Sequence, residues 1–595
     1  MKALILAAGF GNRMSPLTNN KHKTLLEIDG EPIMDRIINS LLINSVNEIL
    51  VVTGYRSEEL ISHLENTFPN VMFEFVHNER FRETNNIFSL SLAFEQKIID
   101  DDILLIESDL IYTTEVISKA INSSYDNVAL VSPYAIGLDG TVVQVQNNQI
   151  TNIFPPHLQD ENFNLFDKFK TLNIYKFSKE FCNNEFKKLL TYYANVIDDN
   201  CYYELILGIL IYMQKRTIYC EIIENDKWVE VDDPNDMMGA EFVFNKKNRL
   251  NILEDSFGGF WNFDVLDFCF IRNMYFPTTS LMAEIRNNLT WLLNNYGSKQ
   301  KILNRKLSYV LQYKEDNLIV LNGAAQIFPI LRIILKNRQV LIPTPTFGEY
   351  NRIFNNPNTY TDSIGFNEEE ISQKLRLSDS IVFVNPNNPT GSILSTEWIF
   401  DLSNKNPDKL FIIDESFIEF SEQKSIISYL ENSRNNNILV IRSMSKSYGM
   451  PGVRLGFVYT NNEIIKEQII QNLPIWNLNS VAEFFLEIIL KNKRALINSF
   501  AQTKLDRNDF RNKLQQQNYI KKAYESEANF LLISIDNSKY DSSNLVLYLL
   551  NECNIYIKEV SEKLNKNGFR FYRIAVRLPH ENDLLITSLN SFFNK

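Results

Sequence analysis

Two series of short apolar runs, each alternating with segments of helical periodicity, constrain the fold of this 595-residue chain most strongly. Between Lys2 and about Leu130 the runs are KALILAA, EILVVTG, VMFEFV, DILLIES and VALVSP. The segments between them carry apolar residues at helical spacing, as in Asp35–Leu42, Ser57–Thr67 and Ile87–Phe94. This alternation predicts an α/β domain with a mostly parallel, doubly wound sheet.

A second series begins near Phe263, with the runs NLIVLNG, QVLIPTP, SIVFVNP, LFIIDES and ILVIRSMS. Just before it, the charged patch NKKNR leads toward a Gly-Gly pair, where we place the junction between domains. We predict a first domain over residues 1–245, a linker over 246–262 and a second, larger α/β domain over 263–595. At roughly 100 to 200 residues per domain, the chain is too long for one compact core.

The composition is that of an ordinary globular protein, with 45% hydrophobic and 22% charged residues. Lys and Arg number 60 against 72 Asp and Glu, which gives a formal net charge of −12. Binding to duplex nucleic acid requires a basic surplus that neutralises phosphates. We therefore expect no nucleic-acid partner.

Nothing in the sequence predicts a membrane anchor. The opening MKALILAAGF runs straight into GFGNRM without a cleavage region, which favours a buried first strand over a signal peptide. The longest later apolar run, Tyr202–Met213, contains Glu204 and is shorter than the ~20 residues that a bilayer requires. The five cysteines are scattered, with no C-x-x-C pair. We expect a cytoplasmic protein.

The first run is followed by the turn LAAGFGNRM. Gly9 and Gly11 let the backbone approach a ligand and offer N–H groups to phosphate oxygens, and Arg13 adds positive charge. A Gly-x-Gly turn alone is equally consistent with a tight connection. Lys23, in KHKTLLEIDG, adds a cation that can neutralise charge on a transferring phosphoryl group.

Two aspartates follow apolar runs, Asp109 in LLIESDL and Asp232 in WVEVDDP. Open α/β sheets bind ligands at the carboxyl ends of their strands. Either residue alone is equally consistent with a solvated strand end. As a pair they suit Mg²⁺, which takes a few carboxylate oxygens together with substrate phosphates and water.

Taken together, LAAGFGNRMSPLT, Lys23, ESD and EVD resemble the sugar-phosphate and choline-phosphate nucleotidyltransferases, over about residues 1–244. FRETNNIFSLSLA (Phe81–Ala93) is similar to the NNIYS-type segment of choline-phosphate cytidylyltransferases. The resemblance implies CTP and a small phospho-amine or amino-phosphonate acceptor. An acceptor oxygen would attack the α-phosphorus in line, and pyrophosphate would leave.

The same resemblance implies roles for individual residues. Lys23 would stabilise the transferring charge, Asp109 and Asp232 would hold Mg²⁺, and Glu204 would bind the acceptor amine. Glu204 is equally consistent with an exposed position on an amphipathic helix. The nucleotide-binding residues implied are Ala8, Gly9, Gly11, Arg13 and Lys23.

The second domain carries a different set of motifs. IRSMSKSYGMPGVRLGF places Lys446 among hydroxyl residues with Arg454 eight residues later, so an amine able to form an imine lies near groups able to hold a phosphate. Asp414 ends LFIID, and Asn388 lies in NPNNPTG. A buried carboxylate can keep a pyridine nitrogen protonated, and an asparagine can donate to a phenolic oxygen.

This set resembles the fold type I, class I/II aminotransferases that use pyridoxal phosphate, especially the histidinol-phosphate aminotransferase and threonine-phosphate decarboxylase branch. The match runs from about Phe263 to the C-terminus. It implies that Lys446 and Asp414 are catalytic and that Arg573, in RIAVR, binds a substrate carboxylate. The cofactor-binding residues implied are Tyr275, Ala324, Ala325, Phe347, Asn388, Asp414, Ser443, Ser445, Lys446 and Arg454.

Two positions in this domain have further implications. Phe417, in DESF, stands where many aminotransferases have tyrosine, so a hydroxyl contact to the cofactor is missing. Tyr275, in NMYFP, matches a tyrosine that in the family reaches the cofactor phosphate across a dimer interface. The resemblance therefore implies a homodimer.

The fusion makes sense if the amine made by one domain is the acceptor of the other. The architecture resembles bifunctional enzymes of phosphonate biosynthesis, in which phosphonoacetaldehyde is aminated, with a donor such as alanine, to 2-aminoethylphosphonate and joined to CMP. The alternative is an O-phospho-amino-acid decarboxylase fused to an ethanolamine-phosphate or choline-phosphate cytidylyltransferase. Both reactions start from the same lysine, so the motifs do not separate them.

Two hypotheses of other classes fit less well. A transcription regulator with an aminotransferase-like domain would carry a small basic helix-turn-helix, whereas this N-terminal region is an α/β domain in an acidic chain. A catalytically inactive scaffold would lack chemical residues, but they are all present: Lys23, Asp109, Asp232, Asp414 and Lys446.

Overall fold

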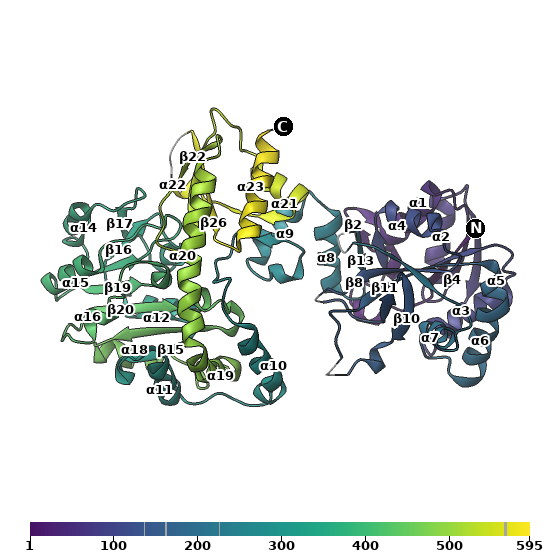
Figure 1. Ribbon diagram of the computed structural model, residues 1–595, viewed down its shortest axis with the longest axis horizontal. Helices are drawn as coiled ribbons and strands as arrows, with labels where there is room; N and C mark the ends of the chain where they lie inside the picture. Colours follow the sequence, from purple (N-terminus) through teal and green to yellow (C-terminus); the bar gives the residue numbers. More distant parts are fainter. Residues whose placement is uncertain (136, 161–162, 225–226, 565–567, 595) are drawn as a thin grey trace. The chain divides into compact units, whose positions relative to one another are not determined.

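The computed structural model describes residues 1–135, 137–160, 163–224, 227–564 and 568–594 (Figure 1). Its contacts divide the chain into two units, Met1–Asp264 and Val265–Lys595. The stretch predicted as a linker includes helix α9 (Arg249–Ser256), which contacts α8 (Pro234–Phe244) and buries Leu253. By its contacts this stretch belongs to the first unit.

The first unit is built on a nine-stranded sheet with the order β5-β4-β1-β6-β11-β8-β12-β10-β9. Strands β5, β4, β1 and β6 are parallel, while β11 runs antiparallel to both β6 and β8. The bounds are β1 (Lys2–Ala7), β4 (Glu48–Thr53), β5 (Met72–His77), β6 (Ile103–Glu107), β8 (Val128–Pro133), β9 (Val142–Gln146), β10 (Gln149–Phe154), β11 (Phe169–Phe177) and β12 (Tyr219–Ile222). The five predicted runs form β1, β4, β5, β6 and β8, which confirms the α/β fold.

Helices cover both faces of this sheet. Ala3 and Ile5 of β1 pack in one core with α1, whereas Leu4 and Leu6 pack in a second core with α3, because successive side chains of a strand point to opposite faces. The helices of this unit include α1 (Ile33–Ile43), α2 (Ser57–Thr67), α3 (Asn86–Gln96), α4 (Thr114–Asn122), α6 (Lys187–Tyr192) and α7 (Glu204–Tyr212).

A small antiparallel ribbon lies beside the main sheet of the first unit. It pairs β7 (Leu110–Tyr112) with β13 (Trp228–Glu230), and the Val231 N–H donates to the Asp109 carbonyl at 2.8 Å. Residues more than 100 positions apart in the sequence are thereby held side by side.

The second unit contains a seven-stranded sheet with the order β15-β21-β20-β19-β18-β16-β17, in which only β21 runs antiparallel to its neighbours. The second series of predicted runs forms β15, β16, β18, β19 and β20. The bounds are β15 (Leu318–Asn322), β16 (Val340–Thr344), β17 (Asn358–Thr361), β18 (Ser380–Val384), β19 (Leu410–Asp414), β20 (Ile438–Ser443) and β21 (Leu455–Thr460).

A second, antiparallel sheet completes this unit, in the order β22 (Ile520–Ala523), β23 (Phe530–Asp536), β26 (Phe569–Ala575) and β25 (Lys558–Glu559). Figure 1 shows the long helix α20 (Lys493–Gln515) running past the large sheet toward β22. The other helices include α10 (Thr279–Leu293), α11 (Gln300–Leu311), α12 (Ile327–Ile334), α13 (Gly348–Ile353), α14 (Glu368–Leu375), α15 (Thr396–Lys405), α17 (Met444–Ser447), α18 (Glu463–Gln471), α19 (Ser480–Ile488), α21 (Leu545–Cys553), α22 (Ser561–Leu564) and α23 (Pro579–Phe593).

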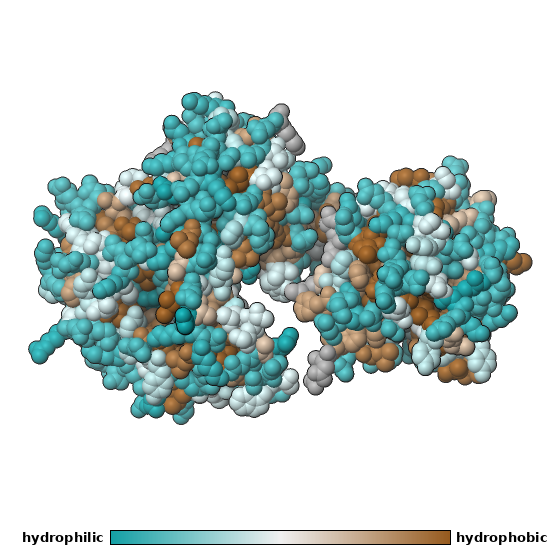
Figure 2. Space-filling model, viewed as in Figure 1, coloured by the Kyte–Doolittle hydropathy of each residue, from teal (hydrophilic) through white to brown (hydrophobic). Residues whose placement is uncertain are grey.

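Hydrophilic residues cover most of the visible surface of each unit, and hydrophobic residues form separate small groups (Figure 2). Among the described residues, no helix combines the length and the apolar character needed to cross a membrane. The apolar run around Glu204 instead forms α7, which buries Ile206, Leu207 and Leu210 against β10.

Candidate active sites

The turn after β1 lies against two segments that are distant in sequence. Gly11 adopts a φ of +66°, which favours glycine, and a Cβ built there would lie 3.4 Å from the Cβ of Lys23. The Arg13 guanidinium donates to a carboxylate oxygen of Asp232 at 2.7 Å. The predicted nucleotide-binding residues all lie on this turn or just beyond it: Ala8, Gly9, Gly11, Arg13 and Lys23.

Lys23 lies between the two aspartates predicted to hold metal. Its Nζ is 3.1 Å from an oxygen of Asp109 and 2.9 Å from an oxygen of Asp232. Burial alone would lower the pKa of Lys23, but the two carboxylates raise it above its usual value. Lys23 and Arg13 in turn hold the pKa of Asp232 below its usual value, against the effect of burial. Three side chains predicted separately are thus in direct contact.

The two aspartates meet in a way that the sequence did not predict. Asp109 lies between β6 and β7, as expected for the end of a sheet strand. Asp232 follows β13, which belongs to the β7–β13 ribbon and not to the main sheet. The ribbon register places Glu230 opposite Leu110, and this brings the segments that follow β6 and β13 together.

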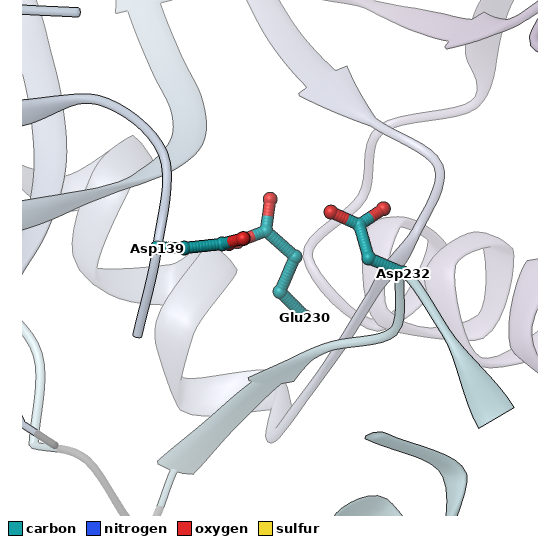
Figure 3. Close-up of side chains that lie close together, drawn as sticks. All are labelled: Asp139, Glu230 and Asp232. Carbon is teal, nitrogen blue, oxygen red and sulfur yellow. The ribbon is translucent and has the colours of Figure 1, made fainter. Parts of the chain in front are cut away.

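Two further carboxylates lie at this site that no motif indicated. Asp139, Glu230 and Asp232 each offer an oxygen within 4.8 Å of the others. Figure 3 shows the Glu230 carboxylate between those of Asp139 and Asp232. Such a set of oxygen ligands suits a hard divalent cation. Glu230 stands two residues before Asp232, a spacing that places side chains on one side of an extended strand, whereas Asp139 carries no sequence signal.

Glu204 lies in a buried acidic region and not on an exposed helix face. It is 3% exposed, and burial raises the pKa of its carboxyl to about 7. Burial and the charge of Glu204 raise the pKa of Glu107, at the end of β6. Lys170 is 2% exposed and its Nζ lies 3.1 Å from Glu230.

In the second unit, Lys446 lies on the short helix α17 directly after β20 and is half-buried. Burial lowers the pKa of its amine, an effect that Asp414 opposes and Arg573 reinforces. The Lys446 Nζ lies 5.3 Å from the ring centre of Phe417. Asp414, at the end of β19, accepts a hydrogen bond from the Tyr350 hydroxyl at 2.9 Å.

Several donors converge on the turn after β15. A Cβ on Gly323 would lie 2.5 Å from a guanidinium nitrogen of Arg454, so the guanidinium lies directly against the backbone that precedes Ala324. The buried Ser445 hydroxyl has no hydrogen-bond partner among the described residues. Ala324 and Ala325 form the turn itself, and Ser443 ends β20.

Arg573, on β26, contacts Asn388. Its guanidinium donates to the Asn388 side-chain oxygen at 2.9 Å and to the Cys269 carbonyl, while its buried Nε has no partner within the described ranges. Phe347 precedes α13. The Tyr275 hydroxyl donates to Asp506 of the same chain, so its predicted contact with a partner's cofactor stays a prediction.

These residues fit pyridoxal phosphate. Ser445 and the guanidinium of Arg454 offer donors for a phosphate group, and Asp414 is a buried acceptor for a protonated ring nitrogen. Lys446 has the lowered pKa that favours a nucleophilic amine. When bound, the cofactor supplies an electron sink for bonds broken at the substrate α-carbon.

The comparisons agree with this division of the chain. Residues 273–587 match the family described as aminotransferase class I and II, and residues 2–136 match the family described as nucleotidyl transferase. Because the first match covers more than half of the chain, the chain belongs to the class I and II aminotransferase family.

Three similar proteins cover different parts of the chain. A CMP-5'-(3-aminopropyl)phosphonate synthase from Streptomyces rubellomurinus is 26% identical, over 99% of this chain and 94% of the relative. An L-serine phosphate decarboxylase from Sulfurospirillum multivorans is 26% identical, over 55% of this chain and 88% of the relative. The structure of the histidinol-phosphate aminotransferase from Clostridium acetobutylicum has a TM-score of 0.50 at 26% identity, over 56% of this chain and 99% of that one.

The fold and the comparisons establish the general kind of protein. It is an enzyme in which a nucleotidyltransferase domain is fused to an aminotransferase-like or decarboxylase-like domain that uses pyridoxal phosphate.

Proposed function

We propose that the first domain joins CMP to a small primary amine that carries a phosphonate, and that the second domain makes this amine. The observation that carries the proposal is the pairing of two charge environments in one site. Cations and carboxylates suited to a metal-bound nucleotide, around Lys23 and Asp232, adjoin the buried acidic region of Glu204. A substrate in which a short chain joins a phosphoryl group to an ammonium would complement both charge environments.

The full-length relative supports CTP as the nucleotide and a phosphonate as the acceptor. Its name describes a CMP conjugate of an aminoalkylphosphonate, and the similarity spans both domains. We propose 2-aminoethylphosphonate or its three-carbon homologue as the acceptor here.

In the first domain the chain would act mainly by positioning and charge neutralisation. The glycine turn and Arg13 would hold the nucleotide phosphates. Asp109 and Asp232 would hold Mg²⁺, with Glu230 within reach, and the metal would neutralise phosphate charge. Lys23 would then stabilise the charge that develops as the phosphonate oxygen attacks.

For the second domain we propose decarboxylation of an amino acid that carries a phosphonate. Such a substrate has two anionic groups, and the site offers more than one cation. One is Arg573, and a second is Lys563, an exposed residue whose ammonium donates to the carbonyl of Thr346, beside Phe347. The similarity to an L-serine phosphate decarboxylase supports the same reaction.

Transamination, the first of the two readings of the sequence, is the second candidate. It is supported by membership of the aminotransferase family and by the similarity to a histidinol-phosphate aminotransferase. In that case the aldehyde substrate carries only the phosphonate, and the amino donor brings its carboxylate in a separate half-reaction.

Two assays test the proposal. The first supplies CTP, Mg²⁺ and one acceptor, and compares kcat/KM for pyrophosphate release. We expect the order aminoalkylphosphonate, then ethanolamine phosphate, then choline phosphate, because a quaternary ammonium donates no hydrogen bond. A preference for choline phosphate would refute the proposed acceptor.

The second assay supplies 2-amino-3-phosphonopropionate, which yields 2-aminoethylphosphonate on loss of CO₂. Release of CO₂ would support decarboxylation. Amino-group exchange between alanine and phosphonoacetaldehyde, without CO₂ release, would establish transamination instead.

A further inference from the structure

The acidic region beside the metal-binding residues brings together carboxyl groups from three different elements. Three carboxyl groups lie in it, from Glu107, Glu204 and Glu230. Lys170 is the buried lysine that faces them, paired with Glu230. Burying an ionised carboxylate without a partner is costly, so these carboxyl groups can be ionised together only when a further cation lies among them.

Asn86 links the two segments that carry Glu107 and Glu204. Its side-chain nitrogen donates to Glu107 at 3.0 Å, and its side-chain oxygen accepts from the Tyr203 N–H, at the start of α7, also at 3.0 Å. Burial raises the pKa of Glu204, and the same Asn86 side chain partly opposes that rise. Glu107, from the sheet, and Glu204, from α7, therefore converge on a single amide.

One carboxyl oxygen of Glu204 is available to a ligand. Its Oε2 is buried and has no hydrogen-bond partner in the part of the chain that the structure describes. A buried acceptor of this kind normally has a partner. A ligand that brings N–H donors and a positive charge would satisfy it.

We infer that Glu107 and Glu204 together bind the primary ammonium of the acceptor, and that Asn86 is a positioning residue that sets their orientation. This inference deepens the proposed function of the first domain and rests on it. Glu107 lies two residues before Asp109, so the ammonium site directly adjoins the residues proposed to hold the metal. The acceptor's phosphonate can thus face the metal while its ammonium enters the acidic region.

The chemistry selects a primary ammonium over related groups. It has three N–H donors and one charge, which match a carboxylate pair that keeps one free acceptor. A trimethylammonium has the charge but no donor. A hydroxyl has a donor but no charge, so it forms no ion pair with the carboxylates.

The test compares two acceptors in charge-removing variants of the full chain. The acceptors are 2-aminoethylphosphonate and 2-hydroxyethylphosphonate, which differ in the group that enters the acidic region. The variants are Glu107→Gln and Glu204→Gln, with Glu65→Gln on the exposed face of α2 as the matched control. The measurement is kcat and KM for pyrophosphate release at saturating CTP and Mg²⁺.

In the wild type we expect a preference for the amine of about 100-fold or more in kcat/KM. Each variant should reduce this preference by at least tenfold, mainly through a higher KM for the amine. The KM for CTP should stay within about twofold, and Glu65→Gln should match the wild type. Amine formation by the second domain, measured on the same samples, shows that the variants are folded.

Two results would overturn the inference. Equal losses of kcat/KM with the amine and the hydroxyl acceptor would show that the two glutamates do not recognise the ammonium. Recovery of activity at high Mg²⁺ would show that they bind metal instead. If the wild type released no pyrophosphate with any aminophosphonate, the proposed function itself would fail. Activity with amines, but with the preference intact in the variants, would refute this inference alone.

Discussion

The ammonium of Lys23 lies 2.9 Å from a carboxylate oxygen of Asp232. The same nitrogen contacts Asp109, so without a ligand the lysine is the countercharge of the two aspartates proposed to hold Mg²⁺. When a metal-bound nucleotide binds, the metal would coordinate these carboxylates in place of the lysine. Lys23 would then be available to the phosphates, which come to lie beside the metal.

Replacing Lys23 by methionine separates these two roles. We expect kcat for pyrophosphate release to fall by about 10² to 10³, as is typical when one stabilising group is lost from a charged transition state. Mg²⁺ alone should bind more tightly, because the competing cation is gone. Lys21→Met, which removes an exposed lysine paired with Glu27, is the matched control. Weaker Mg²⁺ binding by Lys23→Met would contradict the shared use of the carboxylates.

Replacing Asp109 or Asp232 by asparagine should abolish Mg²⁺-dependent pyrophosphate release, since each change removes an anionic ligand. Production of the amine by the second domain should be unaffected. Asp233→Asn is the control, because Asp233 caps α8 and asparagine caps a helix equally well. Loss of both activities in the aspartate variants would point to misfolding rather than to a metal site.

The sequence predicted the strands of the two large sheets, and it placed candidate site residues near strand ends because short motifs follow the apolar runs. Asp414 and Lys446 directly follow long apolar runs, and such runs fix the carboxyl edge of a sheet. The β7–β13 ribbon escaped prediction because each of its strands has only three residues. Its pairing therefore depends on tertiary contacts.

Some residues of the acidic region were not assigned a role from the sequence, and most of them are brought there only by folding. Glu107 could have been predicted from the sequence, because the motif E-S-D places it on the same side of an extended segment as Asp109. Lys170 and Asn86 lie on other elements and reach the acidic region only in the folded chain. Asn86 belongs to the NNIFS segment that the sequence singles out, but that motif does not indicate its contact with Glu107, and no local pattern marks Lys170.

Lys446 should be the residue that carries pyridoxal phosphate. The purified chain should show visible absorbance from the bound cofactor, and borohydride should attach the cofactor permanently to a peptide that contains Lys446. Lys446→Ala should lose this absorbance and amine formation, yet still transfer CMP to an amine supplied ready-made. Labelling of another lysine would contradict the assignment.

Replacing Lys563 tests whether the second site binds both the carboxylate and the phosphonate of its substrate. Lys563→Met should raise KM for 2-amino-3-phosphonopropionate by about tenfold or more, because one charged contact to the phosphonate is lost. Alanine, which lacks the phosphonate, should bind equally well to both proteins, as measured by its perturbation of the cofactor absorbance. An equal effect on both ligands would place Lys563 outside the substrate site.

The pH dependence of acceptor binding should reflect Glu204, whose carboxyl has its pKa raised to about 7 by burial. A raised carboxyl pKa means that the free chain holds the proton below pH 7 and is ionised above it. Ammonium binding requires the ionised form, so KM for 2-aminoethylphosphonate should fall as pH rises from 6 to 8. The phosphonate of the acceptor also titrates in this range, and therefore the wild type alone is not decisive. Glu204→Gln retains the titration of the acceptor but loses that of the carboxyl, so its KM should vary less with pH. Identical pH profiles in the two proteins would exclude Glu204 as the group that binds the amine.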